Sequence, residues 1–260
     1  MTTDVNAFIG GFPFRHIPHP DPEILTQVLA REKIDRAWVG HLPSAFYRDP
    51  SPGNELLFRA LEPHRDVLAP APAIRPDWPK WRASLDAATA RGAAAIRAYP
   101  AQWAMGPHDA SMRELIGACG ERGVPLLLTI RFEDLRQRHW MDGAGDVSAA
   151  HIRDLARVSD RSRIVVTAAG RGTIEEVHWG LTAAERDRVW WDISWIWGPP
   201  SDDLEHLLRT VGPDRFVFGT GWPLRLTQNP RANLDLLPDD LADAAGSIGS
   251  NLASHLARKE

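Results

Sequence analysis

Short apolar runs alternate with longer amphipathic stretches along the whole chain. The short runs are rich in β-branched and other apolar residues, as buried parallel strands are, and the longer stretches have the periodicity of helices that pack one face on a sheet. Eight runs are predicted to be strands, at residues 4–10, 35–41, 67–74, 93–100, 124–131, 163–170, 188–195 and 215–222. The pattern therefore predicts eight consecutive β/α units.

Helical stretches are predicted in each gap between these strands. The first begins after a proline-rich turn, where Asp21 suits the cap position and Pro22 suits the first helical position. Its apolar stripe consists of Ile24, Leu25, Val28 and Leu29. A later helix is expected to begin at a Ser201 cap, and two closing helices are predicted at residues 239–246 and 250–259.

The number of units favours a closed (β/α)₈ barrel, the TIM barrel of the α/β class, over an open doubly wound sheet. No glycine-rich GxGxxG loop follows the first strand, and each helix-to-strand connection is short, as right-handed crossovers in one sheet require. A length of 260 residues matches one such barrel. We therefore expect residues 1–260 to form a single (β/α)₈ domain.

Composition and charge restrict the class of partner. With a formal net charge of −4 and a pI near 6.2, the chain has no basic excess to bind phosphate backbones or anionic lipid, so we expect neither a nucleic-acid nor a membrane partner. A small-molecule ligand is expected instead. The first residues lack the regions of a secretory signal, and no apolar run approaches the ~20 residues that span a bilayer, which favours the cytoplasm. The one cysteine, Cys119, lies in an apolar helical stretch and is interpreted as a buried, inert thiol.

Candidate functional side chains are concentrated where the predicted strands end. In a parallel barrel these ends and the loops after them form the active site. The candidates are Arg15, His16, His41, Arg97, Tyr99, Arg131, Asp134, Arg136, His139, Trp191, Asp192, Trp195 and Trp222. Many of them are arginines and tryptophans, which are suited to bind anions and planar rings.

The segments at these strand ends resemble the signatures of the amidohydrolase-related barrel family over nearly the whole chain. That family opens with Asp-x-His-x-His-x-Gly on its first strand, and the segment DVNAFIG aligns with it while placing Asn6 and Phe8 at the histidine positions. The segment GAAAIRAYP is similar to the family's fourth strand, with Arg97 near the position of a lysine or carboxylate. Near the end of the chain, GSNLASHL resembles the family's closing helix, with its Asn251.

The same resemblance implies that the family's metal site has been lost. Thr129 stands at the histidine position of strand five, Ala168 at that of strand six, and Gly221 at that of the strand-eight aspartate, in FGTGWP. Zinc in a hydrolytic site needs about three histidine or carboxylate ligands, and phenylalanine, alanine and glycine supply none. We therefore expect neither a metal nor another cofactor, and no metal-bound hydroxide as nucleophile.

A substitute metal site built from His16, His19, His41 and His139 is a weak alternative. His16 and His19 flank Pro18 in a proline-rich loop, so they do not share a helical face. These histidines are more simply interpreted as loop residues that bond to backbone or water.

The arginines at the predicted mouth have two interpretations. Guanidinium groups bind carboxylate or phosphate oxygens, but Glu133 and Asp134 also offer partners for a structural ion-pair network. The arginines concerned are Arg15, Arg97, Arg131 and Arg136. Arg97 is predicted to anchor an anionic ligand, because an inward-facing arginine in an apolar strand needs a partner and Tyr99 follows it on the same face.

The tryptophans and acids at the mouth indicate an aromatic pocket with a proton-transferring group. The predicted lining tryptophans are Trp191, Trp195 and Trp222, although tryptophan also fills barrel interfaces. Asp192 is the predicted general base, because neighbouring tryptophans would raise its pKa by desolvation. Asp134 with His139 is the alternative acid–base pair.

Two hypotheses about function follow from the sequence. The first is a metal-independent hydrolase of a lactone- or amide-type bond, or a related decarboxylase, that acts on a small carboxylated or aromatic molecule held by Arg97 and Arg15. The second is a catalytically silent protein that binds a metabolite or a partner in the same pocket. Barrels of this kind often form dimers, so a homodimer is a candidate assembly.

Overall fold

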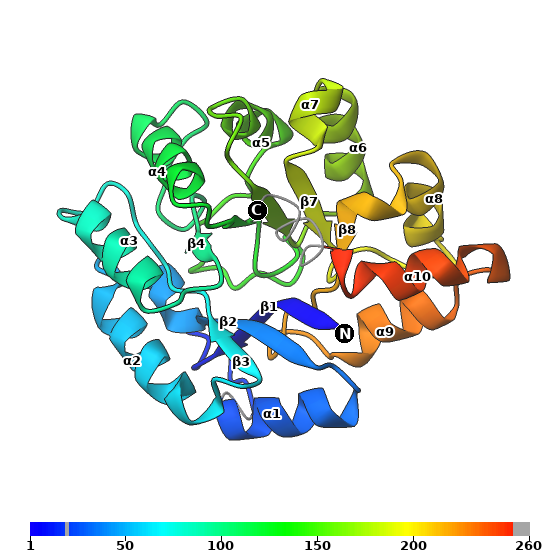
Figure 1. Cartoon of the computed structure of the whole chain (residues 1–260), viewed down its shortest axis with the longest axis horizontal. Coiled ribbons are helices and arrows are strands. Elements are labelled where there is room, and N and C mark those ends of the chain that lie inside the picture. The colour runs from blue at the N-terminus through cyan, green and yellow to red at the C-terminus, as the bar shows by residue number, and fades with distance from the viewer. Residues whose placement is uncertain (19–20, 252–260) are drawn as a thin grey trace.

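The computed structural model of the chain describes residues 1–18 and 21–251 and has the (β/α)₈ architecture that the sequence predicts. Figure 1 shows the strands at the centre and the helices around them. The strands are β1 (Thr3–Ile9), β2 (Arg36–His41), β3 (Leu68–Pro70), β4 (Ile96–Ala98), β5 (Leu126–Thr129), β6 (Ile164–Thr167), β7 (Val189–Asp192) and β8 (Phe216–Val217). Each predicted strand overlaps one of these, so the eight strand predictions are confirmed.

Helices follow the strands in alternation. They are α1 (Pro22–Arg31), α2 (Ser51–Leu61), α3 (Trp81–Ala90), α4 (Ala110–Glu121), α5 (Ala149–Ala156), α6 (Arg171–Trp179), α7 (Ala183–Arg186), α8 (Asp203–Thr210), α9 (Gln228–Asp235) and α10 (Ala242–Ile248). α1 begins at Pro22 as predicted, although the Asp21 side chain makes no capping hydrogen bond. α8 begins at Asp203 with Asp202 in the cap position, so the predicted cap at Ser201 is wrong.

Two helical segments differ from the sequence prediction in another way. The hydrophobic pattern predicts no helix at α9, because its sequence, QNPRANLD, has no apolar stripe. The predicted closing helix at residues 250–259 lies almost entirely outside the described residues, and so does His19.

Backbone hydrogen bonds close the strands into a ring. β1, β2 and β3 form one parallel ladder, and β4 to β8 form another. A bridge between Ala73 and Arg97 joins the end of β3 to β4, and a hydrogen bond of 2.9 Å from Val5 N to Phe218 O joins β1 to the segment after β8. The carboxyl ends of all eight strands therefore lie at one rim of the barrel.

The barrel interior is apolar near the amino ends of the strands and polar further on. One apolar cluster takes a member from each strand or its flank: the buried residues Val5, Ala71, Ala95, Leu127, Val165, Trp190 and Val217, with the partly buried Trp38 packed against them. Side chains alternate along a strand, so residues two positions further on face the same interior. There the interior becomes polar, because Arg97 follows Ala95 and Asp192 follows Trp190.

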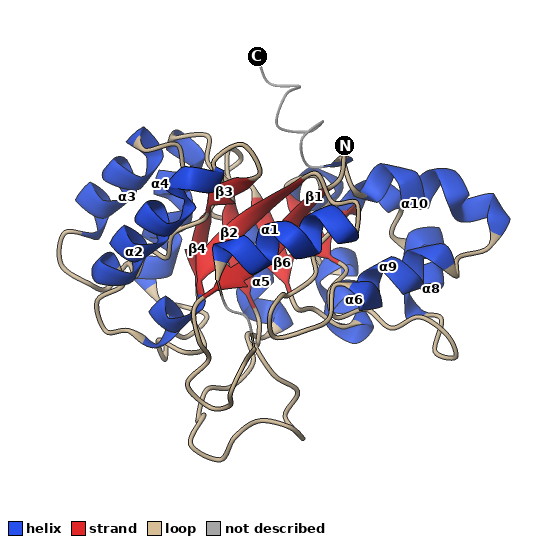
Figure 2. Cartoon of the chain, turned by 90° about the horizontal axis from the view of Figure 1, so that it is seen from below, coloured by secondary structure: helices blue, strands red, loops and turns tan. Residues whose placement is uncertain are grey.

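The two rims of the barrel differ in character. In Figure 2 the N-terminus lies at one rim, and long loops project from the opposite rim. The longest connection from a strand to its helix comprises residues 130–148, between β5 and α5. Within the described residues, no helix has the length and apolar character needed to cross a membrane.

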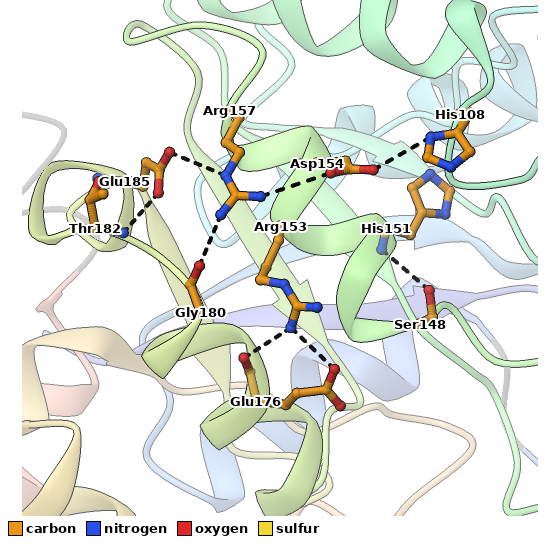
Figure 3. A network of polar contacts seen from close by, with 10 residues as sticks. All are labelled: His108, Ser148, His151, Arg153, Asp154, Arg157, Glu176, Gly180, Thr182 and Glu185. Carbon is orange, nitrogen blue, oxygen red and sulfur yellow. Dashed lines mark hydrogen bonds and ion pairs between the residues drawn. The ribbon is translucent and has the colours of Figure 1, made fainter.

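Polar contacts fix α5 against the helices that follow it (Figure 3). Arg153 Nη1 donates a hydrogen bond to Glu176 O of α6 at 3.0 Å. Arg157 Nη2 donates to Gly180 O at 2.9 Å, and Arg157 Nε lies 3.3 Å from Glu185 Oε1 of α7. These contacts join three successive helices of the outer layer.

Candidate functional site

The guanidinium of Arg97 lies in the barrel interior and is completely buried. Its Nη1 donates a hydrogen bond to Asn6 Oδ1 at 3.0 Å, and its Nη2 donates to Ala7 O at 3.2 Å. Its Cζ lies 4.1 Å from the centre of the Phe8 ring. Gly40 makes room for this side chain, because a Cβ there would lie 2.6 Å from Arg97 Nε. Arg97 therefore joins β4 to β1 through contacts within the protein.

The carboxylate of Asp192, at the end of β7, is bound on both of its oxygens. Asn6 Nδ2 donates to Oδ2 at 2.7 Å, and the Ala168 N–H donates to Oδ1 at 2.9 Å. Gly219 is needed beside it, since a Cβ there would lie 2.7 Å from Oδ2. Burial raises the pKa of Asp192, as the sequence predicts, but the side chain is held by protein groups and lines neither cavity described below.

A second buried carboxylate, Asp4, ties the start of β1 to the end of β8. Its Oδ1 accepts hydrogen bonds from the N–H groups of Asn6 (2.9 Å) and Thr220 (3.0 Å), and its Oδ2 accepts one from Thr220 Oγ1 (2.6 Å). Burial raises the pKa of Asp4 to about 6, although these hydrogen bonds oppose the shift. Asn6 thus links the Arg97 guanidinium to the carboxyl groups of Asp4 and Asp192.

A small cavity lies above this polar interior, at the carboxyl rim, and we call it the axial cavity. Its polar lining is formed by Asn6, Thr129, Arg131, Ser194 and Arg225, and its aromatic lining by Phe8, Phe132 and Trp195. Its volume of about 20 Å³ leaves room for roughly one water molecule. Of the residues predicted to bind a ligand, Arg131 and Trp195 lie here.

Arg225, in the loop after β8, is a partly buried cation at this rim. Its Cζ lies 3.4 Å from the centre of the Trp195 ring, and its side chain makes no hydrogen bond or ion pair with another described residue. Burial lowers the pKa of Arg225 to about 10, so it remains charged at neutral pH. Arg131 lies 5.5 Å from the same ring, and although its Nη2 pairs with Asp146 at 3.1 Å, its buried Nε has no hydrogen-bond partner among the described residues.

A larger cavity of about 120 Å³ lies beside the axial one, between the β7–α8 loop and α9, and we call it the lateral cavity. It shares Ser194, Trp195 and Arg225 with the axial cavity. Its remaining polar side chains include two asparagines of α9, Asn229 and Asn233. Arg225 and Trp195 therefore form a common wall between two spaces.

Two predicted arginines form ion pairs and line neither the axial nor the lateral cavity. Arg15 Nε lies 2.7 Å from Glu133 Oε1, and Arg136 Nε donates to Asp134 Oδ1 at 2.9 Å. The hydrogen bonds from Arg136 lower the pKa of Asp134 to about 2. For Arg15 and Arg136 the structure agrees with the network interpretation, and Asp134 is a poor acceptor of protons near neutral pH.

The predicted histidines and Tyr99 are also separate from the two cavities. His41 Nδ1 lies 2.8 Å from Ser44 Oγ, and burial lowers the pKa of His41. His139 stacks on Phe14 with ring centres 5.7 Å apart, and His16 is exposed. The Tyr99 ring is buried among core aromatics, and burial raises its pKa to about 12.

The predicted pocket tryptophans divide into one that lines the cavities and two that do not. Trp191 is 1% exposed and belongs to the main apolar core, and Trp222 packs partly buried against that core. Of the three, Trp195 alone lines the axial and lateral cavities. Cys119 is buried in α4, where burial raises its pKa to about 12, in keeping with an unreactive thiol.

Comparison with protein families identifies the group of proteins to which this barrel is related. A family model described as amidohydrolase matches residues 53–246. The chain belongs to the amidohydrolase family. No curated protein matches the sequence with significance.

Solved structures with low sequence identity share the fold of this amidohydrolase-family chain. An uncharacterized TIM-barrel protein from Bordetella bronchiseptica has a TM-score of 0.69 and 15% identity, covering 99% of this chain and 98% of that one. A dihydroxybenzoic acid decarboxylase from Polaromonas sp. JS666, with bound manganese and the inhibitor 2-nitroresorcinol, has a TM-score of 0.70 and 12% identity. The match covers 100% of this chain and 97% of that one. A probable 2-pyrone-4,6-dicarboxylic acid hydrolase from Acinetobacter baumannii, with citric acid bound, has a TM-score of 0.62 and 10% identity. The match covers 98% of this chain and 99% of that one.

The divalent metal that the family fold implies does not fit the residues of this barrel. Asn6 uses its amide oxygen for Arg97 and its amide nitrogen for Asp192, and Phe8 covers the Arg97 guanidinium. Within residues 1–18 and 21–251, no group of three or more His, Cys, Asp or Glu side chains is arranged to hold a metal ion. The positive charge beside the interior carboxyl groups is supplied by Arg97.

Three residues that shape the site are absent from the sequence predictions. Asp4 stands at the aspartate of the family's opening motif, which is a signal that the sequence did contain. Arg225 and Asn229 carry no such signal, because they follow the strand-eight motif in a loop and in a helix without an apolar stripe.

Proposed function

We propose that this amidohydrolase-family barrel binds a small planar carboxylate at its carboxyl rim, without a divalent metal, and serves as a binding protein. The observation that carries the proposal is Arg225, a partly buried guanidinium that stacks on Trp195 and has no anionic partner among the described residues. A carboxylate can accept two hydrogen bonds from such a group, and a planar ring can lie against the neighbouring indole.

The charges around the rim favour an anionic ligand. Arg131 adds a second guanidinium, whose Cζ lies 5.5 Å from the centre of the Trp195 ring and whose buried Nε has no hydrogen-bond partner among the described residues. The nearby Glu133 carboxylate is already paired with Arg15. Among structures with the same fold, one is named a dihydroxybenzoic acid decarboxylase and another holds citric acid, which supports a carboxylate as the ligand class.

Binding is favoured over catalysis because the cavity walls offer no group for proton transfer. A general acid or base must come within hydrogen-bond reach of the reacting atom. The side chains that line the axial and lateral cavities include no His, Cys, Asp or Glu among the described residues. Arginine stays protonated and cannot accept the proton.

A metal-independent hydrolase or decarboxylase is the second candidate, and one observation favours it. Asp192 has a raised pKa and lies directly behind Asn6, which lines the axial cavity. Displacement of the Asn6 amide by a substrate would give Asp192 access to that cavity as a general base.

The proposal is tested by calorimetric titration of benzoate and 2,6-dihydroxybenzoate into protein purified without chelator and freed of any affinity tag. Arg225→Gln should weaken binding at least tenfold, because it removes the charge but keeps hydrogen-bonding capacity. Arg136→Gln, which removes an exposed and already paired arginine, is the matched control and should leave the affinity unchanged. Equal affinities for wild type and Arg225→Gln would contradict the proposal.

Two further measurements on the same samples separate the alternatives. Elemental analysis should find no stoichiometric zinc or manganese, and dialysis against a chelator should not change the affinity. Chromatography of the incubated ligands should show no product. Turnover by the wild type that is lost in Asp192→Asn would instead establish the enzymatic candidate.

A further inference from the structure

We infer that the organic body of the ligand lies in the lateral cavity, with its carboxylate on Arg225 and a polar ring substituent on Asn229. This inference rests on the proposed function, because it assumes that Arg225 binds the carboxylate. It moves the ligand away from the barrel axis, to the space between the β7–α8 loop and α9. In Figure 1, α8 and α9 lie on the same side of the barrel.

The volumes of the two cavities place the ligand body. The axial cavity, at about 20 Å³, has room for roughly one water molecule and for no ring. The lateral cavity, at about 120 Å³, is six times as large. Arg225 and Trp195 line both, so a ring attached to a carboxylate on Arg225 has more enclosed room in the lateral space than in the axial one.

The walls of the lateral cavity suit a small aromatic ring. Trp195 supplies a buried indole already stacked with a guanidinium, and Trp197, which is 53% exposed, supplies a second indole. Indole surfaces bind planar rings through offset stacking or edge contacts. An aromatic carboxylate is therefore a better fit than a branched aliphatic one.

The two asparagines of α9 have different roles in this cavity. Asn233 Nδ2 donates to Ile196 O at 2.8 Å, and its approach requires Gly198, where a Cβ would lie 2.4 Å from Asn233 Oδ1. Asn233 therefore positions the β7–α8 loop. The Asn229 side chain makes no hydrogen bond with another described residue, so its amide is free to bond a hydroxyl or amino substituent of the ligand. The ligand class is a monocyclic aromatic carboxylate with one such substituent.

Filling the lateral cavity without touching Arg225 tests the inference. Asn229→Phe places a ring in the cavity from α9, and Ala232→Phe, on the same helix but exposed and outside the cavity lining, is the matched control. Acetate, which has no ring, and salicylate are titrated into each variant and followed by the indole N–H signals in NMR spectra. Thermal unfolding of each variant verifies that it is folded.

We expect Asn229→Phe to weaken salicylate binding at least tenfold and to leave acetate binding within about twofold of the wild type. Ala232→Phe should change neither. Salicylate binding that survives in Asn229→Phe but is lost in Arg225→Gln would overturn the lateral placement and leave the proposed function intact. If Arg225→Gln retains the wild-type affinity for both ligands, the proposed function fails, and the inference fails with it.

Discussion

Arg97 donates a hydrogen bond to Asn6 across the barrel interior, from Nη1 to Oδ1 at 3.0 Å. The same amide donates to Asp192 at 2.7 Å, so Asn6 bridges the guanidinium on β4 and the carboxylate on β7 by hydrogen bonds. These two partners fix the orientation of the Asn6 amide. If the amide were reversed, its NH2 donor would face the guanidinium, which is also a donor, and its oxygen acceptor would face the carboxylate, which is also an acceptor. Asn6 stands at a position where the family resemblance implies a histidine metal ligand, and in this chain it joins Arg97 to Asp192 instead.

Replacement of Arg97 by methionine should strongly destabilise the protein. The Arg97→Met variant keeps an unbranched side chain but leaves Asn6 Oδ1 without its donor and removes the buried charge that interacts with Asp4 and Asp192. Loss of one member of a buried charged network costs about 3–5 kcal/mol. Urea unfolding at pH 7 should show a decrease of this order in the free energy of unfolding.

The control for this prediction is Arg136→Met. Arg136 is exposed and, among the described residues, pairs with Asp134 alone, and surface ion pairs contribute less than about 1 kcal/mol. Equal costs for the two variants would show that Arg97 has no special structural role.

The buried carboxyl of Asp4 should make the protein more stable at mildly acidic pH than at neutral pH. Burial raises its pKa from 3.8 to about 6, so between these values the folded state binds more protons than the unfolded state. The free energy of unfolding therefore falls as the pH rises from about 4 to about 6 and levels off above. A shift of about two pKa units corresponds to roughly 3 kcal/mol.

Asp4→Asn isolates this contribution. Asp192, whose pKa is also raised, is present in both proteins, so the comparison reports Asp4 together with its interaction with Asp192. The free energy of unfolding of Asp4→Asn relative to wild type should rise by roughly 3 kcal/mol between pH 4 and pH 7. Asp134→Asn serves as the control, because its pKa is lowered and its titration acts in the opposite direction. Parallel pH profiles for wild type and Asp4→Asn would refute the assignment.

The sequence predicts the barrel well because its strands carry a local signal. The run at residues 163–170 contains β6, and the run at 188–195 contains β7, in each case with the predicted carboxyl end extending into the loop. The alternation of side chains along β4 predicts that Arg97 faces the barrel interior, and the structure confirms it. Its partner could not be predicted in the same way, because β1 has a register irregularity between Asp4 and Ala7, where strict alternation does not hold.

The candidate site is predictable only where its residues belong to strands or follow them closely. Arg131 and Trp195 were identified from their positions at strand ends, and both line the axial cavity. Arg225 lies beyond β8, after Gly221, whose φ of +72° creates a turn that few other residues adopt. Its position over Trp195 depends on that turn and on two loops far apart in the sequence, which hydrophobic periodicity does not describe.

Gly40 should be intolerant of even one additional carbon atom, because Arg97 fills the space beside it. A Cβ in Gly40→Ala would lie 2.6 Å from Arg97 Nε and 2.7 Å from its Cδ. Arg97 is completely buried and held by hydrogen bonds, so it cannot move aside without losing one of them. Overpacking of this kind costs about 1–3 kcal/mol, which urea unfolding would measure. Gly143→Ala, with nothing within 4 Å of the added carbon, should cost much less, and a similar loss in both variants would mean that the guanidinium has room to yield.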